Sequence, residues 1–79
     1  MFTHQRIIKD IIHHYGIDIT YFVALGLLHI DDAKHWLISK EYRRLYNGGG
    51  YSYKKVKLYL SDRYGVSIST IEKIIYRNH

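Results

Sequence analysis

The feature that most constrains this chain is the absence of proline from a sequence whose branched apolar residues recur at helical spacing. Near the N-terminus, isoleucines and a tyrosine follow one another at intervals of three and four residues, the period of an amphipathic helix. These residues are Ile7, Ile8, Ile11, Ile12 and Tyr15. Because the β-branched residues sit at helical rather than alternating spacing, the sequence predicts an all-α fold of four to five short helices.

Glycines and side chains that favour helix caps divide the first half of the chain into three expected helices. The second of these, ITYFVALGLLHI, is apolar around nearly its whole circumference, which is typical of a central helix or of one at an interface. Its interior Gly26 costs about 1 kcal/mol relative to alanine and therefore favours close helix packing. The expected helices are 3–15, ended by Gly16; 19–30, capped by Asp18; and 33–46, capped by Asp31 or Asp32.

The run NGGG at 47–50 ends the third helix and predicts a flexible joint, because asparagine and glycine tolerate positive φ. After this joint, Ser52 is placed to cap a fourth helix over 53–64, which Gly65 ends. The side chains expected on its inward stripe are Tyr53, Val56, Leu60 and Tyr64. Three lysines are then left toward solvent, namely Lys54, Lys55 and Lys57.

A fifth helix is expected to begin only two residues after Gly65, with Ser67 as its cap and Val66 turned inward. Its apolar side consists of Ile68, Ile71, Ile74 and Ile75. Two helices joined by so short a turn must cross at a steep angle, which directs the first residues of the second helix outward.

Length and charge bound the organisation of the chain. With 79 residues it is expected to form one small domain over 1–79, in which the apolar helices of 1–46 complete the core or form a homodimer. Residues 1–39 carry three basic and four acidic side chains, whereas residues 40–79 carry nine basic and three acidic ones. The net charge of +5 is therefore concentrated in the second half, which indicates a polyanionic partner such as nucleic acid.

The absence of cysteine excludes disulfides, thiolate metal sites and a cysteine nucleophile, and it fits a cytoplasmic protein. The stretch MFTHQRIIKDIIHH lacks the continuous apolar core of a secretory signal. The longest apolar stretch, from Ile19 to Ile30, is shorter than the roughly 20 residues that a bilayer span needs. We therefore expect no membrane partner.

From Lys57 onward, KLYLSDRYGVSISTIEKIIYR resembles the helix-turn-helix family of DNA-binding domains. The resemblance rests on GVS at 65–67 in the turn and on apolar residues of the two helices, namely Leu60, Tyr64, Ile71 and Ile74. It departs from the family at Ser61, where alanine is usual, so this hydroxyl must find a backbone partner or the crossing angle must open. The resemblance implies a C-terminal helix-turn-helix within 51–79 that binds duplex DNA.

A second likeness extends upstream of this motif. The stretch KEYRRLYNGGGYSYKKVKLYLSDRYGVS is similar to the basic C-terminal modules of Mor-type activators from phages and mobile elements. The segment between the glycine joint and the turn is longer here than in that family. For this reason neither the dimer architecture nor the promoter target of that family is transferred to this chain.

The resemblance implies that residues just inside the last helix face base edges in the major groove. The residues expected there are Ser67, Ser69, Thr70 and Lys73. Lysine donates to guanine, whereas hydroxyls donate to or accept from several bases, so the base selectivity of this set would be modest. Glu72 either accepts from cytosine or forms a capping box with Ser69, which would start the helix two residues later. Ile68 is either core or a contact to a thymine methyl group.

Phosphate contacts are expected from basic side chains around the same helices, and such contacts position a protein without reading sequence. The expected residues are Lys54, Lys55, Lys57 and Arg77, with Arg43 and Arg44 as further candidates. Three tyrosines among these cations have phenols that reach phosphate or stack on bases, namely Tyr51, Tyr59 and Tyr76. Stacking leaves single-stranded DNA or RNA open as an alternative partner.

Six histidines are the residues that most suggest metal or catalytic chemistry. The adjacent residues His13 and His14 diverge by about 100 degrees on a helix, so they cannot share a metal ion. No HExxH motif, phosphate-binding loop or nucleophile elbow is present. The sequence therefore predicts neither an enzyme nor a cofactor, and it leaves the hypothesis that histidine protonation near pH 6 tightens DNA binding.

The function that these observations predict is sequence-specific binding of duplex DNA by a small transcriptional regulator. A homodimer would present two recognition helices to half-sites about 34 Å apart, so a palindromic operator is the expected target. One alternative is an interaction module that docks the apolar helix 19–30 on a protein partner. Another is an accessory DNA-binding subunit of a recombination or transposition complex.

Overall fold

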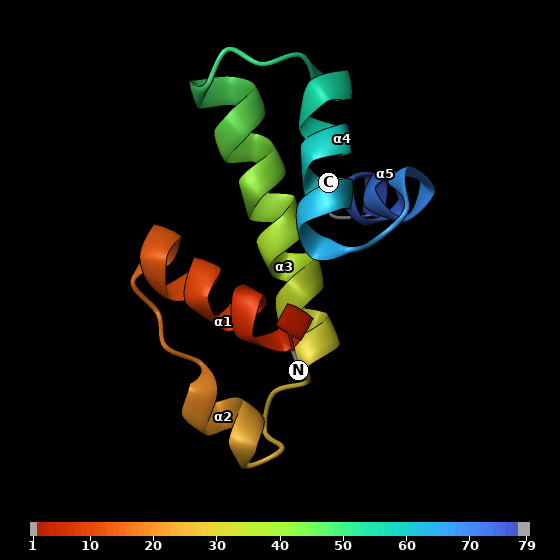
Figure 1. The fold of residues 1–79 in the computed structure, drawn as a ribbon. Helices are drawn as coiled ribbons and strands as arrows, with labels where there is room; N and C mark the ends of the chain where they lie inside the picture. Colours follow the sequence, from red (N-terminus) through yellow and green to blue (C-terminus); the bar gives the residue numbers. More distant parts are fainter. Residues whose placement is uncertain (1, 78–79) are drawn as a thin grey trace. The chain divides into compact units, whose positions relative to one another are not determined.

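The computed structural model describes residues 2–77 as helices connected by short turns (Figure 1). The elements are α1 (Phe2–Tyr15), α2 (Thr20–Ala24), α3 (Ile30–Arg43), the π-helical turn η1 (Arg44–Gly48), α4 (Tyr53–Tyr64) and α5 (Ile68–Arg77). No strand occurs in the described part of the chain, which confirms the expected all-α fold. The chain divides into two compact units: unit 1 ends at Leu37 and unit 2 begins at Ile38, inside α3.

Unit 1 is built from α1, α2 and the first turns of α3. As the sequence predicts, α1 ends at Tyr15, and Gly16 follows it in the left-handed conformation with φ 68°. The rings of Tyr15 and Trp36 meet edge to face, with centroids 5.2 Å apart, and thereby connect α1 to α3. The buried apolar side chains of this unit are Ile7, Ile11, Ile19, Ala33 and Leu37.

The prediction of a helix over 19–30 is wrong for most of that range. The helix α2 ends at Ala24, and Gly26 lies beyond it with φ 74°, where an added Cβ would meet no atom within 4 Å. This glycine therefore serves a turn rather than a close helix contact. No residue of α2 is buried, so of the two expected positions the central one is wrong, and an interface position stays a prediction.

The third helix starts earlier than its expected caps. Because α3 begins at Ile30, Asp31 and Asp32 lie in its first turn, where carboxylates interact favourably with the helix dipole, and neither residue precedes the helix as a cap. At the other end, η1 continues the winding as far as Gly48. The glycine run then ends it, with Gly50 at φ 73°.

In unit 2, α4 begins and ends where the sequence predicts, and α5 begins after Ser67 as predicted. Ser52 accepts a hydrogen bond from the backbone N–H of Lys55 at 3.3 Å, and Gly65 closes α4 in the left-handed conformation with φ 65°. α4 packs against both η1 and α5, and α5 runs across α4 at a steep angle (Figure 1). The buried apolar side chains of this helix pair are Val56, Leu60, Tyr64, Ile71 and Ile74.

Candidate nucleic-acid interface

One face of α5 presents polar side chains at regular intervals. Ser69, Lys73 and Arg77 recur every four residues, so they lie on the same side of the helix, and all three are exposed. Successive members of this set are about 6 Å apart along the helix axis. Ile71 and Ile74 are buried and hold the other side of the helix. We call the exposed set the α5 face.

Two side chains that were expected at the interface, those of Ser67 and Thr70, interact with each other at the start of α5. The hydroxyl of Ser67 accepts a hydrogen bond from the backbone N–H of Thr70 at 3.1 Å, and the two side-chain oxygens lie 2.9 Å apart. Ser67 is therefore the cap, as predicted, and the alternative capping box from Ser69 to Glu72 is wrong. Ser69 lies exposed in the first turn of the helix.

The turn between α4 and α5 supplies the backbone partner that Ser61 requires. The Ser61 hydroxyl donates a hydrogen bond to the carbonyl oxygen of Val66. In the opposite direction, the backbone N–H of Val66 donates to the carbonyl oxygen of Ser61 at 3.2 Å. These two bonds close the turn around Gly65 and fix where α5 begins.

The prediction that Lys57 points to solvent is wrong. This residue is only 7% exposed, and its Nζ lies 3.0 Å from Oε2 of Glu72. The ammonium group also lies 5.0 and 5.7 Å from the ring centroids of Tyr53 and Tyr76. The hydrogen bond that Lys57 donates to Glu72 raises the pKa of the lysine, which stays charged at neutral pH. Lys57 joins α4 to α5, and we leave it out of the interface.

Two further expectations change because of this ion pair. Glu72 is engaged with Lys57 through Oε2, so a hydrogen bond from cytosine to this oxygen would compete with the ion pair. Tyr53, expected in the core, is 57% exposed in the first turn of α4, where its ring lies against the Lys57 ammonium group. Tyr64, expected in the core as well, is buried.

The remaining basic candidates of unit 2 are exposed, but they differ in their surroundings. Lys54 and Lys55 lie on α4. Arg43 and Arg44 follow one another at the end of α3 and the start of η1. Arg44 donates from Nε and Nη2 to the two carboxylate oxygens of Glu41, at 2.8 and 2.9 Å, and the Glu41 side chain is fully buried. Arg44 therefore compensates a buried charge, which makes Lys54 and Lys55 better candidates than Arg44 for contacts to phosphate.

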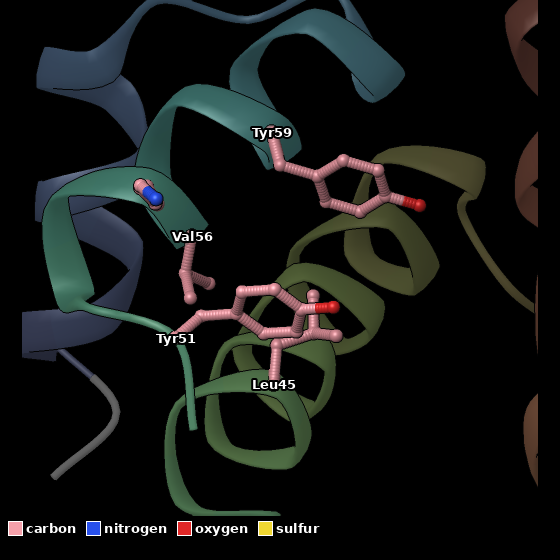
Figure 2. Close-up of a pocket in the computed structure, with 5 residues that line it drawn as sticks. Leu45, Tyr51, Val56 and Tyr59 are labelled. Atoms are coloured by element: carbon pink, nitrogen blue, oxygen red, sulfur yellow. The ribbon is translucent and has the colours of Figure 1, made fainter. Parts of the chain in front are cut away.

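The structure also brings Leu45 together with residues that follow the glycine run. A hollow of about 390 Å³ in unit 2 is lined by Leu45, Tyr51, Lys55, Val56 and Tyr59 (Figure 2). They come from η1, from the segment after the glycine run and from α4. Lys55, Val56 and Tyr59 are neighbours on α4, whereas the approach of Leu45 depends on how the glycine run folds back.

Several findings limit the kinds of site in the described residues. Among residues 2–77, no group of three or more histidine and acidic side chains is placed to hold a metal ion. None of the described helices has the length and apolar character that a membrane crossing needs. Comparisons of the chain with known protein families, with curated proteins and with solved structures found no match.

Proposed function

We propose that the chain binds duplex DNA through unit 2, with α4, the turn at Gly65 and α5 acting as a helix-turn-helix. The observation that carries this proposal is the α5 face, because a hydroxyl and two cations stand exposed along one side of a helix whose other side is buried. The major groove of B-DNA admits an α-helix, and cations on that helix complement the phosphates and the guanine edges.

The charge of unit 2 supports a polyanionic partner. Its nine basic residues outnumber its acidic residues by six. Two of its three acidic residues, Glu41 and Glu72, are paired with Arg44 and Lys57 inside the unit. Binding that neutralises DNA phosphates releases counterions, so the affinity is expected to fall steeply as the salt concentration rises.

The role that fits this binding unit best is that of a small transcriptional regulator. Serine and lysine give modest base selectivity, so one copy of the α5 face would specify only a short site. Two copies joined through unit 1 would present two α5 helices to half-sites about 34 Å apart, on a palindromic operator. An accessory subunit of a recombination complex would use the same surface.

A second candidate function, docking on a protein partner, is favoured by the apolar surface of unit 1. Four apolar side chains are at least half exposed around and after α2, namely Tyr21, Phe22, Leu25 and Leu27. The same unit contains an apolar hollow of about 340 Å³ beside Trp36. Exposed apolar clusters often mark protein contacts, and binding at this surface would be insensitive to changes in α5.

Fluorescence anisotropy of random-sequence duplex DNA across a salt series tests the DNA-binding proposal. The double variant Lys73→Ala, Arg77→Ala should bind more weakly, and the slope of log affinity against log salt should become shallower by about two if both residues contact phosphate. The matched control Lys9→Ala, Lys34→Ala removes two charges from unit 1 and should leave the slope unchanged. Absence of binding at low salt, or equal losses in the two double variants, would contradict the proposal.

A further inference from the structure

The hollow in unit 2 has the construction of a small binding slot. Tyr51 and Tyr59 supply two rings that project in the same direction, with their hydroxyl groups on the same side, and Leu45 and Val56 supply aliphatic surface (Figure 2). Lys55 completes the lining. Both rings are about half exposed, so the slot is open to solvent and can admit a ligand without a rearrangement of the helices. We call these five residues the tyrosine slot.

The backbone of the glycine run holds one ring of the slot in place. A Cβ at Gly49 would lie 2.8 Å from the carbonyl oxygen of Leu45 and 2.8 Å from Cδ2 of Tyr51. The ring of Tyr51 therefore rests against a backbone position that only glycine leaves open. The N–H of Gly49 donates to that same carbonyl oxygen at 3.2 Å, which fixes the backbone under the ring. The slot is thus preorganised on the Tyr51 side.

The lining favours a planar, mostly apolar ligand with one negative charge. Its volume of about 390 Å³ lies in the range of small-molecule sites, which combine apolar and aromatic walls with a few polar groups. Aromatic rings stack on tyrosine, and Lys55 is the one charged residue in the lining. A nucleotide suits the slot less well, because a phosphate carries nearly two charges and a base edge needs more partners than two phenols provide.

We propose that the tyrosine slot binds a small aromatic carboxylate, with its rings against Tyr51 and Tyr59 and its carboxylate at the ammonium group of Lys55. The net positive charge of unit 2 draws such an anion toward the slot. A carboxylate at Lys55 competes with a DNA phosphate, so the bound ligand weakens DNA binding. This regulatory consequence rests on the proposed function, whereas binding of the ligand does not.

Titration of the 79-residue chain with 2-naphthoate, followed by ¹H–¹⁵N NMR, tests the slot. The largest shift changes are expected between residues 45 and 59, around the slot. Neutral 2-naphthamide has the same shape and should bind about threefold more weakly, because it loses an exposed ion pair. Inorganic phosphate has the charge without the rings and should produce no comparable shift changes in the slot.

Matched variants test the aromatic contact and the charge contact separately. Tyr59→Ala removes one ring and should weaken the binding of 2-naphthoate by about tenfold. Lys55→Gln should weaken it by about threefold and leave the binding of 2-naphthamide unchanged. Lys54→Gln removes the same charge from the adjacent exposed position outside the slot, so it should have no effect. Because these three positions are exposed, the variants should keep the helical content of the original chain.

The proposal is overturned if the shift changes centre on unit 1, if Tyr59→Ala has no effect, or if Lys54→Gln weakens binding as much as Lys55→Gln. Stronger binding of adenosine monophosphate than of 2-naphthoate would overturn it as well. DNA anisotropy with and without 2-naphthoate separates this proposal from the previous one. If the chain binds 2-naphthoate but not DNA, the slot proposal is supported and the proposed function is rejected. If it binds DNA but not 2-naphthoate, the slot proposal is rejected and the proposed function is supported.

Discussion

The helix pair α4 and α5 of unit 2 and the helix α2 of unit 1 differ in what they do with their apolar side chains. In unit 2, Leu60, Tyr64 and Ile71 are at most 1% exposed, and the ion pair between Lys57 and Glu72 joins the same two helices. In unit 1, α2 buries no residue, although its sequence is among the most apolar of the chain. The difference teaches that apolar content alone does not decide burial, because a helix also needs a neighbour against which one defined face can pack.

The charged side chains are also divided unequally between the two units. Unit 1 has three basic and four acidic residues, whereas unit 2 has nine basic and three acidic ones. The unit with the well-buried helix pair is therefore the one suited to a polyanion. The nearly neutral unit carries the exposed apolar side chains around α2, and these suit an apolar partner.

The largest effect is expected from the same substitution made in each unit. Leu60→Ala removes a fully buried side chain and should lower the free energy of unfolding by about 2–5 kcal/mol. Leu27→Ala, at a position that is 71% exposed, should change that free energy by less than about 0.5 kcal/mol. Denaturant unfolding followed by circular dichroism measures both. Losses of similar size would mean that the contrast in burial between the units is absent in solution.

A smaller effect is expected at the start of α5. Ser67→Ala removes the hydroxyl that accepts the N–H of Thr70 and should cost about 1 kcal/mol of stability. Ser69→Ala, two residues later on the exposed face, should cost nearly nothing. Thermal unfolding compares the two variants. A larger loss for Ser69→Ala would restore the capping box with Glu72 and remove Ser69 from the α5 face.

The ion pair of unit 2 should make its stability sensitive to high pH. Glu72 raises the pKa of Lys57 above its ordinary value of 10.5, so the contribution of the pair is complete below that value. It is lost as the pH rises through the raised pKa of the folded state. The stability of the original chain relative to Lys57→Met should therefore stay constant up to about pH 10 and fall as the pH rises further.

Thermal unfolding of the two proteins over that range gives the comparison. Burial raises the pKa of Tyr42 and the charge of Lys57 lowers it, so the variant also raises the pKa of this tyrosine, and the comparison includes that change. A difference in stability that stays constant with pH would show that the pair does not hold α4 to α5.

The smallest effect is expected in unit 1, at the turn before α2. Asp18 accepts hydrogen bonds from the hydroxyl and the backbone N–H of Thr20, and these bonds lower the pKa of its carboxyl group. Their contribution is present above the ordinary value of 3.8 and is lost as the pH falls through the lowered pKa. Asp18→Asn should speed amide exchange within α2 at neutral pH and leave the exchange in α5 unchanged. Faster amide exchange in α5 of this variant would show that the two units are coupled.

Local signals in the sequence were sufficient for the helix pair of unit 2. A serine cap satisfies N–H groups of its own helix, and a left-handed glycine closes the helix that precedes it, so both depend on residues only a few positions apart. For this reason the roles of Ser52, Gly65 and Ser67 were predicted correctly. The partner required for Ser61 was also predictable, because the crowding arises within the same turn.

Non-local contacts explain what the sequence could not predict. Lys57 lies at the edge of the apolar stripe of α4, and its residue type suggested solvent, but Glu72 lies 15 positions away on another helix. The tyrosine slot joins Leu45, which precedes the glycine run, to residues that follow it, and no periodic pattern predicts this contact. The apolar stretch 19–30 satisfied the pattern of a buried helix, yet the conformation of Gly26 and the lack of a packed face limited α2 to five residues.

The measurement that tests the division between the units most directly is a map of backbone amide shifts on adding duplex DNA at low salt. Shift changes should concentrate in unit 2, with the largest around Ser69, Lys73 and Arg77, and should fade as salt is added. The amides of α2 should remain unchanged. Shift changes centred on α2, or none in α5 at saturating DNA, would contradict the assignment of DNA binding to unit 2.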